Sequence, residues 1–186
     1  MDWVGPESTI TVEMDDTDYA NLVDEAECET CEGSNQKVRV GVNKAVGEIV
    51  SFEGLSPQDI GLNHAVLSRG LVRKSDDGRV VWTTRIESPN AGGMRIHFSD
   101  FRLSKNFELY LYTQYGEVFG PYTGKGPLNS GDFWSNTVLG SEAFLELRSK
   151  RPADQSDLDK TAFTIAEVAH LEHETAFPRE TDRELP

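Results

Sequence analysis

The feature that most constrains the fold is a two-residue alternation of apolar and polar side chains between Val80 and Arg148. Turn residues such as those at 88–93 interrupt the alternation and divide it into short runs. Successive side chains of a β-strand point to opposite faces, so one apolar face predicts a half-buried antiparallel sheet. The apolar members of the clearest runs are Trp82, Thr84, Ile86, Met94, Ile96, Phe98, Phe107, Leu109, Leu111, Ala143, Leu145 and Leu147.

The remaining sequence extends the same pattern. We predict further strands at 37–46, 63–74 and 162–169, a loop with an apolar anchor at 47–62, and a polar connector at 149–157. Eight to ten short strands, turn signals about ten residues apart and no convincing amphipathic helix favour an all-β fold. The expected architecture is an antiparallel two-sheet sandwich of jelly-roll type, with an up-and-down barrel as the alternative.

Three segments follow from this reading: an acidic N-terminal arm at 1–36, a β-sandwich domain at 37–170 and a C-terminal tail at 171–186. The arm holds eleven of the 32 acidic residues and no Lys or Arg, which leaves 21 acids against 18 bases elsewhere. Such a segment repels nucleic acid and anionic membrane surfaces. We expect a mostly solvated arm with one short strand and a turn of helix. The alternative is that the arm binds a basic partner surface or Ca²⁺.

Membrane and export signals are weak in this chain. It lacks a run of about 18 apolar residues, so we predict no membrane span. Met1, Asp2 and Trp3 do not make the start of a signal peptide. The protein is therefore expected to be cytoplasmic, or exported with its signal peptide outside this sequence.

Cys28 and Cys31 form a Cys-x-x-Cys pair in the acidic arm. Glu27, Glu29 and Glu32 disfavour the thiolate that redox chemistry needs. A structural zinc site needs a second ligand pair, and the chain has two cysteines. We favour a local disulfide in an exported protein, with free thiols in a cytoplasmic chain as the alternative.

Five short blocks stand in a characteristic order and spacing within the central stretch. They are Phe98–Leu103, Leu109–Tyr112, Val118–Gly124, Gly131–Trp134 and Val138–Glu142. Together these blocks resemble the N-terminal propeptide region of secreted bacterial trypsin-fold serine proteases of the lysyl endopeptidase type. A weaker likeness extends to 38–42 and 163–170.

Two departures from that family affect the interpretation. Ser104, Lys105 and Asn106 stand where the family commonly places Pro and Gly-Ala, which is expected to alter a turn but not the next strand. The sequence also contains no Gly-Asp-Ser-Gly-Gly segment. The resemblance thus implies the pro-part alone, or a free-standing relative of it.

The sequence gives little evidence for a catalytic or metal-binding site. The histidines do not stand beside a nucleophile motif, so we predict no catalytic residue and no cofactor. His97 alternates with apolar neighbours and is expected on the polar face of its strand. His170, His173 and Glu174 have usable metal-ligand spacing on a helix, but a strand end entering a solvated tail is the preferred interpretation, so we predict no metal site.

Aromatic side chains are the main candidates for partner binding. We select Tyr110, Tyr112, Tyr122 and Trp134 as contact residues. Asp132 and Asn129 would serve as hydroxyl partners if the ligand were a glycan. Tyrosine is also common on outer sheet faces simply because it fits them.

The resemblance implies a non-catalytic prodomain that helps a trypsin-like protease fold and inhibits it until cleavage. The partner would be a trypsin-fold protease domain, in cis or encoded nearby, and the location secreted or periplasmic. Arg179 and Arg183 in the tail, and Lys150-Arg151, are candidate processing sites, and the two tail arginines are also assigned to the partner. The alternative is an autonomous binding or adhesion module that recognises glycan or a partner protein.

Overall fold

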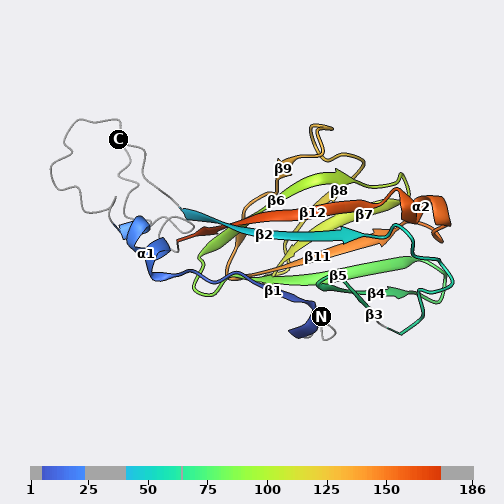
Figure 1. The fold of residues 1–186 in the computed structure, drawn as a ribbon, viewed down its shortest axis with the longest axis horizontal. Coiled ribbons are helices and arrows are strands. Elements are labelled where there is room, and N and C mark those ends of the chain that lie inside the picture. The colour runs from blue at the N-terminus through green and yellow to red at the C-terminus, as the bar shows by residue number, and fades with distance from the viewer. Residues whose placement is uncertain (1–5, 24–40, 64, 173–186) are drawn as a thin grey trace.

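The computed structural model describes residues 6–23, 41–63 and 65–172 as two packed β-sheets with short helices at opposite ends (Figure 1). The larger sheet has the order β3 (Ala65–Leu67), β4 (Gly70–Lys74), β5 (Val80–Glu87), β11 (Glu142–Ser149), β7 (Phe107–Thr113) and β8 (Val118–Tyr122), with β1 (Thr9–Thr11) also on β5. The smaller sheet has the order β10 (Val138–Leu139), β6 (Gly93–Arg102), β12 (Ala162–Leu171) and β2 (Gly41–Ser51), with β9 (Phe133–Trp134) also on β6.

The strand pairing is nested along the chain. The outermost strands β2 and β12 pair, then β5 with β11, then β6 with β9 and β10, and finally β7 with β8. This nested order, divided over two sheets, is that of a jelly roll. The predicted all-β two-sheet sandwich is therefore confirmed, and β1, which pairs with β5 in parallel, is its exception to antiparallel pairing.

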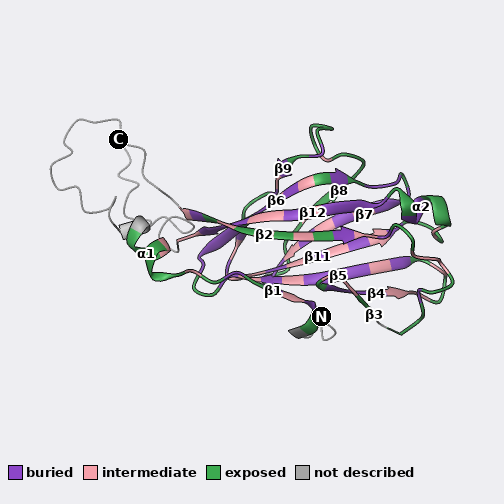
Figure 2. Cartoon of the chain, in the orientation of Figure 1, coloured by how far each residue is buried: buried purple, intermediate pink, exposed green. Residues whose placement is uncertain are grey.

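The predicted alternation is found in the core. Trp82, Ile96, Phe98, Leu109, Leu111, Leu145 and Leu147 are all 0% exposed. Along β11, buried residues alternate with partly exposed ones, and β5 departs from this alternation at the buried Thr83 (Figure 2). The inner faces of both sheets thus meet in one hydrophobic layer, as the period of two requires.

The strand predicted at 37–46 extends further along the chain than expected. Its described part, β2, continues to Ser51, through residues predicted to be a loop. Gly47 has a φ of +68°, and Val46 and Gly47 together lie opposite the single residue Ala166. The glycine therefore makes a β-bulge instead of ending the strand.

The single strand predicted at 63–74 is a hairpin of β3 and β4. Leu67 pairs with Gly70, and Ser68 in the tight turn between them has a φ of +55°. Gly70 lies against the Trp82 ring, where a Cβ atom would be 2.2 Å from Nε1. The hydrophobic pattern missed this turn because its residues are neither Asn-Gly nor Asp-Gly.

Gly120 and Pro121, residue types that usually break a strand, lie inside β8. Leu111 pairs with Phe119 and Leu109 with Tyr122, so Gly120 and Pro121 share one position opposite Tyr110. A proline is tolerated here because β8 is an edge strand and the pair forms a bulge.

The polar connector predicted at 149–157 contains part of a helix, α2 (Gln155–Asp159). Asp154 and Asp157 form its capping box, and Asp157 is buried. The Asp157 carboxylate accepts hydrogen bonds from Ser104 Oγ and Asn106 Nδ2, each at 2.9 Å. Two of the residues that depart from the family pattern thus attach the β6–β7 turn to α2.

The described part of the acidic arm contains η1 (Pro6–Ser8), β1 and α1 (Asp16–Val23). The strand and helical turn predicted there are both present. Ile10 and Val12 are buried, and Val12 N donates to Glu87 O at 2.8 Å, so this part of the arm completes the larger sheet. In the described ranges, no helix is long and apolar enough to cross a membrane.

Candidate functional site

The outer face of the larger sheet carries two of the aromatic residues predicted to contact a partner. Tyr112 lies between Phe144 of β11 and Val118 of β8, and Tyr110 lies beside Glu146. Directly paired residues share a sheet face, so these side chains lie together. We call Tyr110, Tyr112, Phe144 and Val118 the tyrosine face. Val118 is 51% exposed and the three aromatic residues are partly exposed.

Neighbouring charges hold the two tyrosine rings. The Arg148 guanidinium carbon lies 4.2 Å from the Tyr110 ring centroid, and Tyr110 Oη donates to Glu108 Oε2 at 3.0 Å. Burial raises the pKa of Tyr112, and the Glu146 carboxylate raises it further. The Tyr112 phenol therefore stays protonated at neutral pH and can donate to Glu146 Oε1, 3.5 Å away.

Arg85 borders the tyrosine face and is paired with two carboxylates. Its Nη2 lies 2.7 Å from Glu87 and 2.8 Å from Glu142. Arg85 is paired across β5 and β11 with Phe144, so this charged cluster lies next to the apolar strip. An apolar strip with a polar border is the arrangement that many protein interfaces share.

Trp134 lies on the outer face of the smaller sheet, away from the two tyrosines. Its ring stacks on His97 at a centroid distance of 4.8 Å. His97 Nε2 lies 3.1 Å from Asp132 Oδ1 and its Nδ1 lies 3.5 Å from Glu167 Oε2. His97 thus occupies the polar face as predicted, and Asp132 fixes the histidine, whereas Asn129 lies in an exposed turn.

Tyr122 was wrongly predicted to be a surface contact residue. It is 6% exposed, and its ring packs 5.3 Å from Phe133 in the core. Its hydroxyl donates to Asn136 Oδ1 at 3.0 Å. The bulge at Gly120-Pro121 shifts the register of β8 by one residue, which turns Tyr122 inward.

The prediction that His170 faces water was also wrong. It is 2% exposed, and its Nδ1 lies 2.8 Å from Oγ of the fully buried Ser88. The strand β12 continues to Leu171, so His170 lies inside the sandwich. A buried Ser–His pair cannot reach a substrate. Among residues 6–23, 41–63 and 65–172, no group of three His, Cys, Asp or Glu side chains could hold a metal ion.

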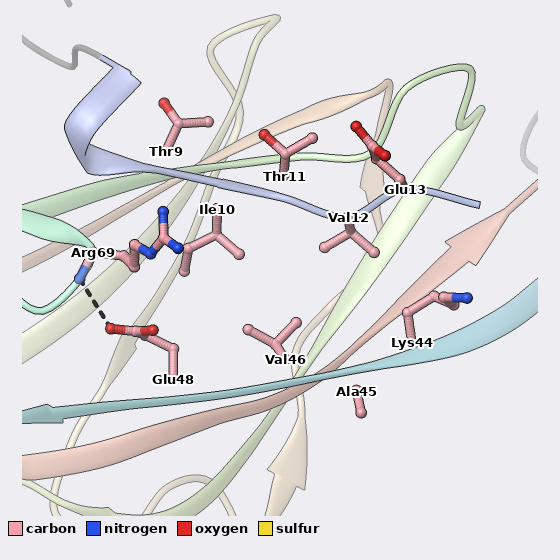
Figure 3. Close-up of a pocket in the computed structure, with 10 residues that line it drawn as sticks. All are labelled: Thr9, Ile10, Thr11, Val12, Glu13, Lys44, Ala45, Val46, Glu48 and Arg69. Atoms are coloured by element: carbon pink, nitrogen blue, oxygen red, sulfur yellow. Dashed lines mark hydrogen bonds between the residues drawn. The ribbon is translucent and has the colours of Figure 1, made fainter. Parts of the chain in front are cut away.

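A cleft of about 410 Å³ lies between β1 and β2, at one open side of the sandwich (Figure 3). Ile10 of β1, Val12 just after β1 and Val46 of β2 point into it. At one end, Arg69 N donates to Glu48 Oε1 at 3.0 Å. Apolar, hydroxyl and charged side chains line the cleft without forming a recognisable catalytic group. We therefore interpret the cleft as the gap between β1 and β2 and not as an active site.

Several predicted residues lie outside the described residues. They are Cys28, Cys31, His173, Glu174, Arg179 and Arg183. The predicted disulfide and the predicted processing sites in the tail remain predictions.

Comparison with models of known protein families and with curated proteins found no match to this chain. The likeness to the propeptide region therefore rests on the five sequence blocks.

Sequence reasoning missed Arg148 and Phe144 as members of this surface. Alternation alone places both opposite the buried residues of β11, but it does not say which strand lies alongside. The pairing of β11 with β7, across a sequence separation of about thirty residues, brings them to the tyrosines.

Proposed function

We propose that this chain is a non-catalytic binding module that docks a partner protein on its tyrosine face. The observation that carries the proposal is the row Phe144, Tyr112 and Val118, which crosses three strands on the outer face of the larger sheet. Tyr and Arg are among the residues most enriched at the energetic centres of protein interfaces. Tyr110, on the same face of β7 as Tyr112, and Arg148, which packs over the Tyr110 ring, lie next to this row.

The arrangement of these side chains suits binding. Tyr110 and Tyr112 have ring centroids 6.3 Å apart, and their hydroxyl groups are directed at Glu108 and Glu146. Side chains that are already held by neighbours lose less conformational entropy when a partner covers them. A pre-ordered aromatic strip that crosses three strands fits a folded protein surface better than a small molecule, which needs a concave site.

The sequence blocks favour one form of this function, a prodomain of a secreted or periplasmic trypsin-fold protease. Such a module would assist folding of the protease and inhibit it until the connecting segment is cut. Linkage in one chain raises the effective concentration to about the millimolar range, so even a weak docking face would keep the protease blocked.

The test is inhibition of the trypsin-fold protease encoded with this chain. The purified full chain should bind the mature protease and slow its cleavage of a small lysyl substrate. Tyr112→Ala should weaken binding about thirtyfold, since truncation at an interface centre costs about 2 kcal/mol. Tyr115→Ala is the matched control, because Tyr115 is 67% exposed in the β7–β8 turn, outside the tyrosine face. Unchanged protease activity at micromolar excess and no complex on size-exclusion chromatography would remove the prodomain form.

A second candidate is glycan binding on the smaller sheet. A hollow of about 260 Å³ is lined by Trp134, Arg95 and Asn43, which combine an aromatic ring with polar groups. A fluorescence change on adding an oligosaccharide that is lost in Trp134→Phe would identify this hollow, because that variant keeps both Trp3 and Trp82. If no oligosaccharide in a diverse panel changes the fluorescence, the result argues against glycan binding.

A further inference from the structure

A second hollow, of about 230 Å³, lies beside the tyrosine face and is bordered by three arginines. Arg73 of β4 is paired with Val81 of β5, which is paired in turn with Arg148 of β11. Directly paired residues project from the same face, so Val81 forms an apolar floor between two guanidinium groups. Arg79, from the β4–β5 turn, adds the third. We call this site the arginine hollow.

The three guanidinium groups are only partly engaged. Arg73 has no ion pair or side-chain hydrogen bond with the residues that the structure describes. Arg79 Nε lies 2.7 Å from Asp77, but both side chains are about half exposed, and such pairs contribute little. Arg148 Nη1 lies 3.5 Å from Glu146, and its guanidinium packs over Tyr110. Guanidinium groups with unused donors therefore line the hollow from β4, β11 and the β4–β5 turn.

The charge of the hollow is opposite to that of the protein. Its lining contains Arg73, Arg79 and Arg148 against the single carboxylate of Glu146, in a chain whose formal net charge is −14. Guanidinium groups present planar pairs of N–H donors that match the oxygens of carboxylate, phosphate and sulfate.

We propose that the arginine hollow binds an oxyanionic group, a carboxylate, phosphate or sulfate, carried by the protein docked on the tyrosine face. Arg148 links the two sites, because it contacts Tyr110 and lines the hollow. The oxyanion site stands on its own geometry, whereas the identity of the carrier rests on the proposed function. The docked protein would place an acidic group over Val81 while its apolar surface covers the tyrosines.

The site can be tested without the partner by NMR titration of the full chain. Sodium phosphate, and separately sodium succinate, is added while sodium chloride keeps the ionic strength constant. The backbone resonances of Arg73, Val81 and Arg148 should shift and saturate. Arg73→Gln should weaken phosphate binding about tenfold, the effect of losing one charge-assisted hydrogen bond of about 1.5 kcal/mol.

Arg102→Gln is the matched control for lost charge. Arg102 is on β6 of the other sheet, is half exposed and lies 3.9 Å from Glu53. This variant should bind phosphate as the parent chain does. Glu146→Gln should bind phosphate several-fold more tightly, because it removes the carboxylate that competes for Arg148. Shifts that do not saturate, or equal losses in Arg73→Gln and Arg102→Gln, would overturn the site.

The carrier is tested with the partner complex. If Arg73→Gln loses phosphate but binds the partner normally, the oxyanion is not on the partner and that assignment is wrong. If Tyr112→Ala keeps saturable phosphate binding and also binds the partner normally, the proposed docking face is wrong and the arginine hollow stands. An unchanged ¹H–¹⁵N spectrum away from the mutated site confirms that each variant is folded.

Discussion

Ser88 Oγ lies 2.8 Å from His170 Nδ1, in a part of the sandwich where neither side chain reaches solvent. Ser88 Oγ also lies 3.3 Å from Val12 O, just after β1. This contact therefore joins the end of β12, the β5–β6 connection and the N-terminal segment. With the Ser88 hydroxyl donating to Val12 O, a neutral imidazole can donate to Ser88 Oγ from Nδ1, and a protonated imidazole would add a charge at this buried position.

We predict that the protein loses stability through His170 as the pH falls below about 6.5. Burial lowers the pKa of His170 from its usual value of 6.5, although the charges of Glu172 and Asp18 partly oppose the shift. The unfolded chain therefore takes up this proton at a higher pH than the folded chain. The stabilisation is complete above about pH 6.5 and decreases as the pH falls below that value.

Urea unfolding between pH 5 and pH 8 measures this effect. The free energy of unfolding should rise with pH across the interval, and His170→Gln should flatten the rise because glutamine does not titrate. Asp18 and Asp77 have lowered pKa values, so the stability that they contribute is lost below about pH 3.8, outside this interval. An identical pH dependence in both chains would remove His170 as its source.

The strand register predicts a strong contrast between neighbouring residues of β7. Leu111 is fully buried, so Leu111→Ala should lower the free energy of unfolding by about 2–5 kcal/mol. Tyr110 is on the outer face, and Tyr110→Ala should cost less than about 1.5 kcal/mol, from its contact with Arg148 and its hydrogen bond to Glu108. Chemical denaturation measures both. Equal losses would contradict the register.

Alternation was enough to predict the two-sheet core, because a period of two places Trp82 and Leu111 on buried faces wherever their strands pair. It failed where the backbone adds a residue. The bulge at Gly47 extends β2, and the bulge at Gly120-Pro121 turns Tyr122 inward. Both need a partner strand to be recognised, and a single sequence does not show which strand that is.

The candidate surfaces were predictable only in part. Tyr110 and Tyr112 lie on the outer face, as their alternation with Leu109 and Leu111 indicated. The arginine hollow was not predictable, because Arg73 and Arg148 are 75 positions apart in the sequence and meet only through β5. Contacts of this kind depend on strand order, which local patterns do not encode.

Asp157 is predicted to be a strong structural residue. Its carboxylate is buried and accepts hydrogen bonds from Ser104 and Asn106, and Arg151 Nη2 lies 3.5 Å away. Asp157→Ala leaves those donors without their acceptor and should lower the free energy of unfolding by about 2–4 kcal/mol. Asp159→Ala, at an exposed position of the same helix, is the control and should change it by less than about 0.5 kcal/mol. Similar losses in the two variants would show that α2 is held by something other than this network.

Gly70, the first residue of β4, and Gly116, in the β7–β8 turn, should differ in their tolerance of alanine. A Cβ on Gly70 would lie 2.2 Å from Trp82 Nε1, and Trp82 is 0% exposed and donates to Leu67 O at 3.0 Å, so the ring cannot move aside. Gly70→Ala should therefore cost about 3 kcal/mol and shift the emission of the buried tryptophan. Gly116 has a φ of +89°, but a Cβ atom there would meet no atom within 4 Å, so Gly116→Ala should cost only the backbone strain of about 1 kcal/mol. Equilibrium urea unfolding followed by tryptophan fluorescence compares the two. A Gly70→Ala chain as stable as Gly116→Ala would mean that the β3–β4 turn does not close over Trp82.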